Sequence, residues 1–383
     1  MANLFDYLSW RGDLSFQLSP FNEIDSLILT RLSYFPMDGI VSDVNLDIAI
    51  SDVCNQILSI ICDENSDTFK KIHVKDDIRL IRELRDSPRF KDLGLSCYEN
   101  HIDVDIEQQF SAVTIRCDAE TNYIAFRGTD NTLVGWKEDF NMNFIFPIPS
   151  QRESVNYLKK VAANDERKLI VGGHSKGGNL AVYSAAFCGN KIQKRILRVF
   201  NHDGPGFTRE TLDEPGYKNI CAKVETSVPQ SSVFGMLLEH EESYRVTHST
   251  SSGLMQHDLY SWELHRNRFV TLDTVTNSSK FINRTIKEWV GKITLEERET
   301  FIDAIFEVFS SINVETMHEL TATWYKHPMT ILKTYVNMDE RTRKLVGQLI
   351  IDLLKTAKDN ISLIRDNENR NAGKSAEEIQ SSN

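Results

Sequence analysis

One short segment constrains the fold of this chain more than any other. Residues 169–180 read LIVGGHSKGGNL: an apolar run comes first, then the pattern Gly-x-Ser-x-Gly around Ser175, and then small residues that continue to position 187. The apolar run is typical of a buried strand, and the small residues that follow are typical of a helix. A serine between the two must occupy a sharp, strained turn, and Gly173 and Gly177 leave the space that this turn requires.

Two other glycine-rich loops bind phosphate groups, and neither fits this segment. A Walker loop requires G-x-x-x-x-G-K-[ST], whereas Lys176 precedes the glycine pair here. A dinucleotide-binding loop requires G-x-G-x-x-G, which the segment lacks. The segment therefore predicts a nucleophile elbow. In such a turn Ser175 projects its hydroxyl above the sheet edge, and the following helix directs its positive end at a developing oxyanion.

The residues around this segment predict an α/β fold. Two short apolar runs at 112–115 and 123–126 flank a polar turn, which is the pattern of a β-hairpin. Further along the chain, helix-like stretches alternate with short apolar strands, expected at 196–200, 222–225 and 244–246. This alternation indicates a mostly parallel central sheet flanked by helices.

The pattern also divides the chain into four regions. A length of 383 residues leaves room for two domains, or for one large α/β domain with an appendage. We expect an N-terminal helical region over 1–105 that packs on the core, and the α/β core itself over 106–265. A helical C-terminal extension is expected over 266–366, followed by a polar tail over 367–383.

The composition excludes several classes of protein. The chain has 44 Lys and Arg against 55 Asp and Glu, so no basic excess is available to displace counterions from nucleic-acid phosphates. No stretch reaches the roughly 18 consecutive apolar residues of a transmembrane helix. Residues 1–6 lack the basic start and the apolar core of a secretory signal, and the sequence therefore predicts a cytoplasmic protein.

The six cysteines indicate neither a metal site nor a disulfide framework. They are scattered, with no C-x-x-C pair and no closely spaced group of Cys and His. Each is expected to be a small buried apolar residue in a reducing compartment. The sequence thus predicts no metal and no organic cofactor. The cysteines are Cys54, Cys62, Cys97, Cys117, Cys188 and Cys221.

A serine hydroxyl is a weak nucleophile unless a base accepts its proton and an acid orients that base. In folds with a nucleophile elbow, the chain order is serine, then Asp or Glu, then histidine. Asp203 follows the next predicted strand and precedes a Gly-Pro-Gly turn, so it belongs at the ligand-facing edge of the sheet. It is our candidate acid; the competing carboxylates are Asp213, Glu225 and Asp258.

The base must come after the acid in this order. His257 lies in a loop beyond the last predicted strand, which is where the order requires a histidine. His248, at the end of that strand, is the alternative. We therefore expect a triad of Ser175, Asp203 and His257.

An oxyanion hole requires two backbone N–H donors. The first is expected from Lys176, directly after the nucleophile, and the second from Thr129, in the tight turn after an early strand. The Thr129 hydroxyl is a further candidate donor. We expect Arg127 to brace this turn through a carboxylate such as Asp139.

Two apolar segments, 144–147 and 233–238, are candidates for an acyl pocket or a lid. Ordinary core packing explains both equally well. The residues assigned to substrate binding on this basis are Phe144, Phe146, Met236 and Leu237.

Taken together, these motifs resemble the class 3, fungal-type lipases, and more closely their bacterial Mbeg1-like branch. The resemblance covers about residues 20–262 and implies an α/β-hydrolase fold with a Ser-Asp-His triad. The stretches that carry it include FRGT at 126–129 with Trp136 and Asp139, GHSKGGNLA at 173–181, DGPG at 203–206 and QHD at 256–258.

The acid departs from the class 3 pattern. In class 3 lipases it usually follows a later strand, in a D-x-V-P-like loop. Here the corresponding residues 227–232 read SVPQSS and contain no carboxylate. Asp203 instead resembles the acid of the pancreatic-type lipases, which follows the earlier strand.

The reaction expected from these residues is hydrolysis of an ester of a hydrophobic acyl group through an acyl-enzyme. The expected partner is a small-molecule or lipid ester. A thioesterase, amidase or peptidase would use the same triad, and a non-catalytic binding protein of this fold is a further alternative. The apolar faces of the C-terminal helices would allow homo-oligomers, although packing on the chain's own catalytic domain is commoner.

Overall fold

The computed structural model describes residues 1–61, 75–130, 132–142, 146–312 and 324–381. The chain forms two compact units, Met1–Val275 and Thr276–Asn383. Each unit is described by itself below. The predicted boundaries at 105/106, 265/266 and 366/367 stay predictions.

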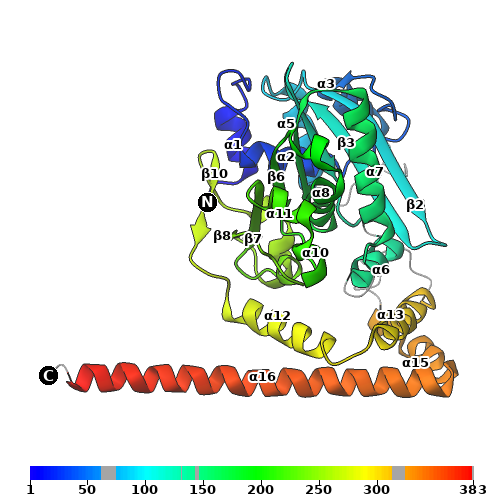
Figure 1. The fold of residues 1–383 in the computed structure, drawn as a ribbon, viewed down its shortest axis with the longest axis vertical. Helices are drawn as coiled ribbons and strands as arrows, with labels where there is room; N and C mark the ends of the chain where they lie inside the picture. Colours follow the sequence, from blue (N-terminus) through cyan, green and yellow to red (C-terminus); the bar gives the residue numbers. More distant parts are fainter. Residues whose placement is uncertain (62–74, 131, 143–145, 313–323, 382–383) are drawn as a thin grey trace. The chain divides into compact units, whose positions relative to one another are not determined.

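A nine-stranded sheet forms the centre of the first unit (Figure 1). Its middle five strands, β4 to β8, are parallel, and the strands at both edges are antiparallel. The predicted α/β fold class, with helices on both faces of the sheet, is confirmed. In spatial order the strands are β1 (Ile48–Ala49), β2 (Gly94–Asp103), β3 (Gln108–Arg116), β4 (Thr121–Phe126), β5 (Lys168–His174), β6 (Ile196–His202), β7 (Val224–Pro229), β8 (Tyr244–Thr247) and β11 (Thr271–Leu272). A separate small hairpin pairs β9 (Leu264–His265) with β10 (Arg268–Phe269).

The alternation of side chains along each strand gives the sheet two hydrophobic cores. Along β4, Tyr123 and Ala125 point into one core, whereas Ile124 and Phe126 point into the other. Successive side chains of a strand lie on opposite faces, so both faces of β4 must be covered. The hairpin predicted from this pattern is confirmed, with Ile115 of β3 opposite Tyr123.

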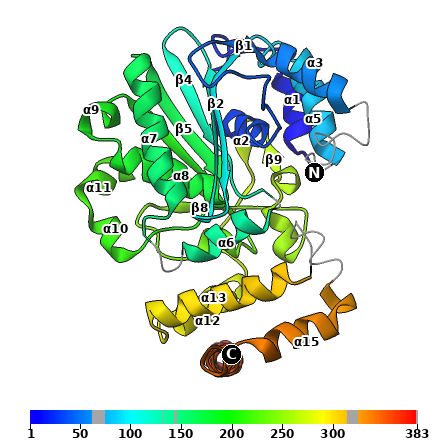
Figure 2. The same ribbon diagram turned by 90° about the vertical axis from the view of Figure 1, so that its right-hand side faces the viewer.

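Different parts of the chain cover the two faces, as Figure 2 shows. One face packs against helices that follow the hairpin in sequence: α7 (Pro149–Asn164), α8 (Lys176–Phe187) and α11 (Pro215–Cys221), with the shorter α6 (Leu133–Asn141), α9 (Asn190–Gln193) and α10 (Arg209–Asp213) nearby. The other face packs against the N-terminal helices α1 (Leu4–Arg11), α2 (Glu23–Leu32), α3 (Ile50–Ile61) and α5 (Lys75–Asp86). Of these, α2 lies directly on β4, β5 and β6.

A buried ion pair anchors α2 to the rest of the N-terminal region. Asp25 accepts two hydrogen bonds from the Arg89 guanidinium, at 2.7 and 2.6 Å, and a third from the Tyr7 hydroxyl at 2.8 Å. Neither side chain of the pair is exposed to solvent. The remaining guanidinium donors bind the backbone oxygens of Leu14 and Ser19, so the buried charges are well compensated.

The second unit is helical, with α12 (Asn277–Val290), α13 (Leu295–Ser310), α15 (Pro328–Asn337), α16 (Glu340–Ser381) and the short 3-10 helix η4 (Trp324–Lys326). The helix α16 packs against α12 and α13, and the Trp289 indole donates to the Leu349 oxygen at 3.0 Å. Thr294 and Glu297 form the capping box that begins α13. Among the helices of the described residues, none is both long and apolar enough to cross a membrane.

We predict that Arg89→Met destabilises the first unit by about 3–5 kcal/mol, because it leaves the Asp25 carboxylate buried without a counter-charge. Urea denaturation followed by circular dichroism measures this change. Arg85→Met is the matched control, since the Arg85–Asp86 pair is exposed, and it should change the free energy of unfolding little. Equal, small effects of the two substitutions would contradict a role for the buried pair.

Candidate active site

The candidate nucleophile lies in a strained turn between β5 and α8. Ser175 has φ of 57° and ψ of −132°, a backbone conformation that non-glycine residues rarely adopt. The turn packs so closely that a Cβ atom at Gly173 would clash with the backbone of Gly177, and one at Gly177 would clash with Phe126 O. The predicted strand, serine and helix are therefore arranged in space as a nucleophile elbow requires.

The candidate acid follows the neighbouring strand. Asp203 comes directly after β6, is fully buried, and has a φ of 53°. Its amide donates to Ser227 O at 2.8 Å, and its Oδ1 accepts a 2.5 Å hydrogen bond from the Ser232 hydroxyl. Ser232 belongs to the loop after β7, so this loop provides a hydroxyl that orients the carboxylate.

The candidate base is paired with this acid. His257 ends the short 3-10 helix η2 (Gly253–His257), and its Nδ1 lies 2.6 Å from Asp203 Oδ2. A carboxylate only accepts, so Nδ1 carries the proton and Nε2 is the basic nitrogen. His257 is largely buried, with 22% of its side chain exposed.

The structure brings His257 to the elbow but does not hydrogen-bond it to the nucleophile. The rings of His257 and His174, the residue before Ser175, lie 4.3 Å apart between centroids. Among the hydrogen bonds of the described residues, none joins the Ser175 hydroxyl to the His257 ring. In enzymes without a bound substrate, this bond is often long and tightens when the substrate arrives.

The alternative acids and base have partners elsewhere. His248 lies 2.5 Å from the Glu263 carboxylate. Glu225 pairs with Arg198, Asp213 pairs with Arg209, and Asp258 accepts from the Tyr260 amide.

A buried network underlies the two candidate oxyanion donors. Lys176 begins α8, and its ammonium donates to Gln109 O, Gln109 Oε1 and Glu138 Oε2 at 2.8, 2.9 and 2.8 Å. The side chains of Lys176 and Glu138 are fully buried. Glu138 belongs to α6, whose next residue, Asp139, accepts the hydroxyl proton of Thr129. One helix therefore contacts the side chains of both candidate donor residues.

Arg127 pairs with a carboxylate of the turn, as expected, but this carboxylate is Asp130 and not Asp139. The Arg127 guanidinium donates to Asn100 Oδ1 at 2.9 Å and lies 3.5 Å from Asp130 Oδ2. Asp139 instead accepts a hydrogen bond from the Thr129 hydroxyl, because α6 directs this carboxylate toward the turn after β4. Burial raises the pKa of Asp139 to about 6, although Lys176 and Thr129 act in the opposite direction.

The four predicted substrate residues are not all placed near His257. Phe146 packs against the core beneath α7 and α8, and Met236 packs against Val228 and Val246, so core packing accounts for both. Leu237 is half-buried, and Phe144 lies outside the described residues.

Among the described aromatic residues of these two segments, Phe234 contacts the candidate base. Its ring centroid lies 4.5 Å from that of His257 and 6.0 Å from that of Trp136. Phe234 belongs to the segment singled out from the sequence, but its hydrophobicity alone did not distinguish it from its neighbours.

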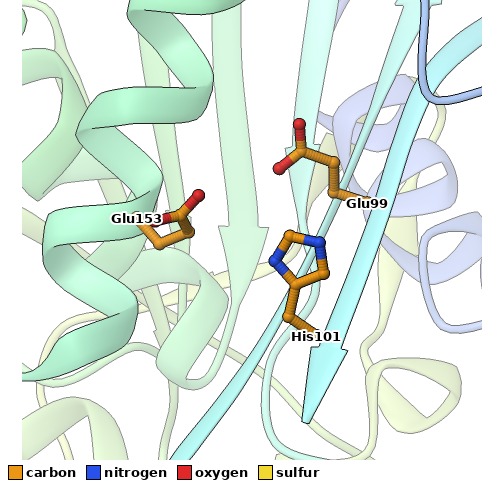
Figure 3. A group of neighbouring side chains, drawn as sticks. All are labelled: Glu99, His101 and Glu153. Carbon is orange, nitrogen blue, oxygen red and sulfur yellow. The ribbon is translucent and has the colours of Figure 1, made fainter. Parts of the chain in front are cut away.

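One group away from the elbow has the residue types of a metal site. Glu99 and His101 of β2 and Glu153 of α7 each offer a ligand atom, and these atoms lie within 4.8 Å of one another (Figure 3). However, the Lys160 ammonium lies 2.8 Å from Glu99 Oε1 and already balances its charge, and His101 is exposed. This competition disfavours a cation in the group.

The structure brings Asp203 and His257 together beside the strained turn at Ser175, in a protein of the α/β class. Residues 84–307, more than half of the chain, match the profile of the Mbeg1-like family. The chain therefore belongs to the Mbeg1-like family. No match was found among curated proteins.

Among solved structures, the chain is similar to three lipases over part of its length. A fungal lipase in complex with an inhibitor is 18% identical, with a TM-score of 0.32, over 40% of this chain and 66% of the other. M37 lipase is 14% identical, with a TM-score of 0.33 and coverages of 55% and 68%. Rhizomucor miehei lipase with its propeptide is 17% identical, with a TM-score of 0.32 and coverages of 56% and 63%. The match thus spans slightly less than two thirds of both fungal chains.

We predict that Asp139→Asn stabilises the protein at pH 8 by up to about 3 kcal/mol, the value of a pKa shift of roughly two units. The pKa of Asp139 is raised in the fold, so its contribution favours folding at low pH and is lost as the pH rises from about 4 through 6. The amide, which stays neutral, avoids this cost.

Urea denaturation of both proteins between pH 4.5 and 8 measures the difference, which should shrink toward acid pH. Glu120→Gln, at an exposed carboxylate, is the control and should leave the pH dependence unchanged. A stability difference between Asp139→Asn and the parent that is the same at every pH would contradict the assignment.

Proposed function

We propose that this protein is a serine hydrolase that cleaves carboxylic esters, with Ser175 as the nucleophile, His257 as the general base and Asp203 as the acid that orients it. The observation that carries the proposal is the 2.6 Å contact between Asp203 and His257 beside the strained turn at Ser175. A buried carboxylate paired with a histidine at such a turn has the chemistry needed to activate a hydroxyl.

The first half of the reaction forms an acyl-enzyme. His257 Nε2 accepts the proton of the Ser175 hydroxyl while the oxygen attacks the ester carbonyl. Asp203 keeps the proton on Nδ1 and stabilises the imidazolium that forms. The imidazolium then donates its Nε2 proton to the leaving alcohol, and the bond between the carbonyl carbon and the alcohol oxygen breaks.

The second half returns the enzyme to its starting state. Water attacks the acyl-enzyme while His257 accepts a proton from it, and the carboxylic acid leaves as Ser175 regains its proton. In both halves the tetrahedral oxyanion is stabilised by the backbone N–H groups of Lys176 and Thr129. The hydrogen bonds from Lys176 to Glu138 and from Thr129 to Asp139 support this assignment, because they fix both donor residues before the reaction starts.

The surroundings of His257 favour an apolar acyl group. The Phe234 ring contacts His257, and Trp136 contacts Phe234. In η2, Leu254 and Met255 expose 62% and 68% of their surface close to the base. A small-molecule or lipid ester fits this environment. A cytoplasmic location and homo-oligomers through the C-terminal helices stay predictions of the sequence.

A fluorophosphonate probe tests the nucleophile and its partners. We expect the probe to label the native protein and to leave Ser175→Ala unlabelled, because the probe reacts with an activated serine oxygen. Asp203→Asn and His257→Gln should label about 10³- to 10⁴-fold more slowly. Rates are followed by gel fluorescence or by mass spectrometry of the intact protein.

Two matched variants serve as controls in that experiment. Asp258→Asn and His248→Gln alter the alternative acid and base, and both should label at the native rate. A native protein that stays unlabelled would identify a non-catalytic member of the fold. Loss of labelling in His248→Gln but not in His257→Gln would reassign the base.

Hydrolysis of p-nitrophenyl esters of increasing chain length tests the substrate class. We expect kcat/KM to rise from acetate to octanoate, because a longer acyl chain buries more apolar surface against Phe234. Phe234→Ala should weaken this preference without abolishing acetate hydrolysis. Faster turnover of a matched thioester or anilide than of the ester would instead assign a thioesterase or an amidase.

A further inference from the structure

His174, the residue before the candidate nucleophile, has a side chain that the proposed reaction does not use. This ring is buried at the end of β5 and contacts two groups that are distant in sequence. Its Nε2 lies 2.9 Å from the backbone oxygen of His257, and its Nδ1 lies 2.9 Å from the hydroxyl of Tyr34. Tyr34 follows α2 and belongs to the N-terminal helical region.

We propose that His174, fixed by Tyr34, is a positioning residue for the catalytic imidazole of His257, so that the N-terminal helical region takes part in the active site. This inference rests on the proposed function.

The hydrogen bonds define the tautomer of His174. A backbone oxygen only accepts, so His174 Nε2 must carry the proton that it shares with His257. Nδ1 is then an acceptor, and the Tyr34 hydroxyl must donate to it. The path from Tyr34 through His174 to the His257 backbone therefore has one consistent direction. Removal of the Tyr34 hydroxyl would leave Nδ1 buried without a donor.

Tyr34 is itself fixed by the turn that carries Thr129. The Tyr34 hydroxyl packs against the backbone of Gly128. A Cβ atom at Gly128 would clash with that hydroxyl and with His174 O. The absence of a side chain at Gly128 therefore lets the turn after β4 pack directly against Tyr34. One phenol thus contacts both the candidate oxyanion turn and the end of β5.

Three residues restrict the position of His257 through four contacts. Asp203 binds its Nδ1, and His174 binds its backbone oxygen. Its ring also contacts the rings of His174 and Phe234, at centroid distances of 4.3 and 4.5 Å. Asp203 alone would fix only one ring atom, and the imidazole could still pivot about that bond. The contacts from His174 remove this freedom, which matters because a misplacement of about 1 Å can cost roughly 10²-fold in rate.

The charge of His174 suits this role. Burial lowers the pKa of His174 well below its ordinary value, and the nearby His257, Arg31 and His202 act in the same direction. His174 therefore stays neutral at neutral pH. Apart from the His257 backbone, its hydrogen-bond partner is the hydroxyl of Tyr34. A neutral ring does not repel the imidazolium that forms on His257 during the reaction.

Kinetics of three variants test the inference. Tyr34→Phe removes only the hydroxyl, His174→Leu removes the bond to His257, and His174→Gln keeps an N–H donor. We expect kcat for an ester to fall about 10-fold in the first and about 10²-fold in the second, with KM changed little, because substrate binding does not use these groups. His174→Gln should recover most of the loss.

Tyr157→Phe is the matched control. Its hydroxyl is also buried and donates to Cys97 O at 2.7 Å, in the core beneath α7. Its loss should lower stability to a degree comparable with Tyr34→Phe and leave kcat unchanged. Equal kcat values for Tyr34→Phe, His174→Leu and the native protein would overturn the inference, as would equal losses in Tyr34→Phe and Tyr157→Phe.

A second measurement separates this inference from the proposed function. Nitrogen-15 NMR of the histidine side chains reports tautomer and titration without turnover. We expect His174 to appear as the neutral Nε2–H tautomer, and the His257 signals to shift in Tyr34→Phe but not in Tyr157→Phe. Ser175-dependent probe labelling with unchanged His257 signals would overturn the positioning role alone. A native protein that stays unlabelled would overturn the proposed function, and the positioning role of His174 with it.

Discussion

The close backbone approach around Ser175 is the constraint on which the rest of the site depends. The glycines on either side let β5, α8 and the end of β4 meet without side chains between them. This contact holds Ser175 in a left-handed conformation that a relaxed chain would leave. Packing in the two hydrophobic cores on either side of β5 offsets the strain of this turn. Val171 packs into one core and Ile170 into the other.

The two faces of the sheet contribute differently to the site. The face covered by α7 and α8 supplies the buried Lys176–Glu138 pair beneath the candidate oxyanion donors. The opposite face, covered by α2, supplies Tyr34 and through it the contact to His174. The buried ion pair thus lies beneath the candidate oxyanion donors, whereas the candidate base contacts the Asp203 carboxylate and the neutral His174 ring.

Much of the fold was predictable from the sequence, because the decisive patterns are local. The strand at 169–171, the serine between glycines and the small-residue helix adjoin one another in the chain, as do the two strands of the hairpin. Contacts between segments were harder to predict: Asp139 lies within α6, and its partner proved to be Thr129 and not Arg127. Side-chain partners depend on how helices dock on the sheet, and hydrophobic pattern gives the buried face of a helix but not its axial position. For the same reason nothing in the sequence distinguished Phe234 from Met236 as the neighbour of His257.

Because α2 packs on one face of the sheet, it limits where the chain can be truncated. The segment that matches the family profile begins at residue 84, whereas α2 and Tyr34 precede it. A chain trimmed to the matched segment would expose Tyr123, Ile170 and Phe200 to water along the middle of its sheet. Such a bare apolar surface invites aggregation. The smallest autonomous unit therefore extends well upstream of the region by which the family is recognised.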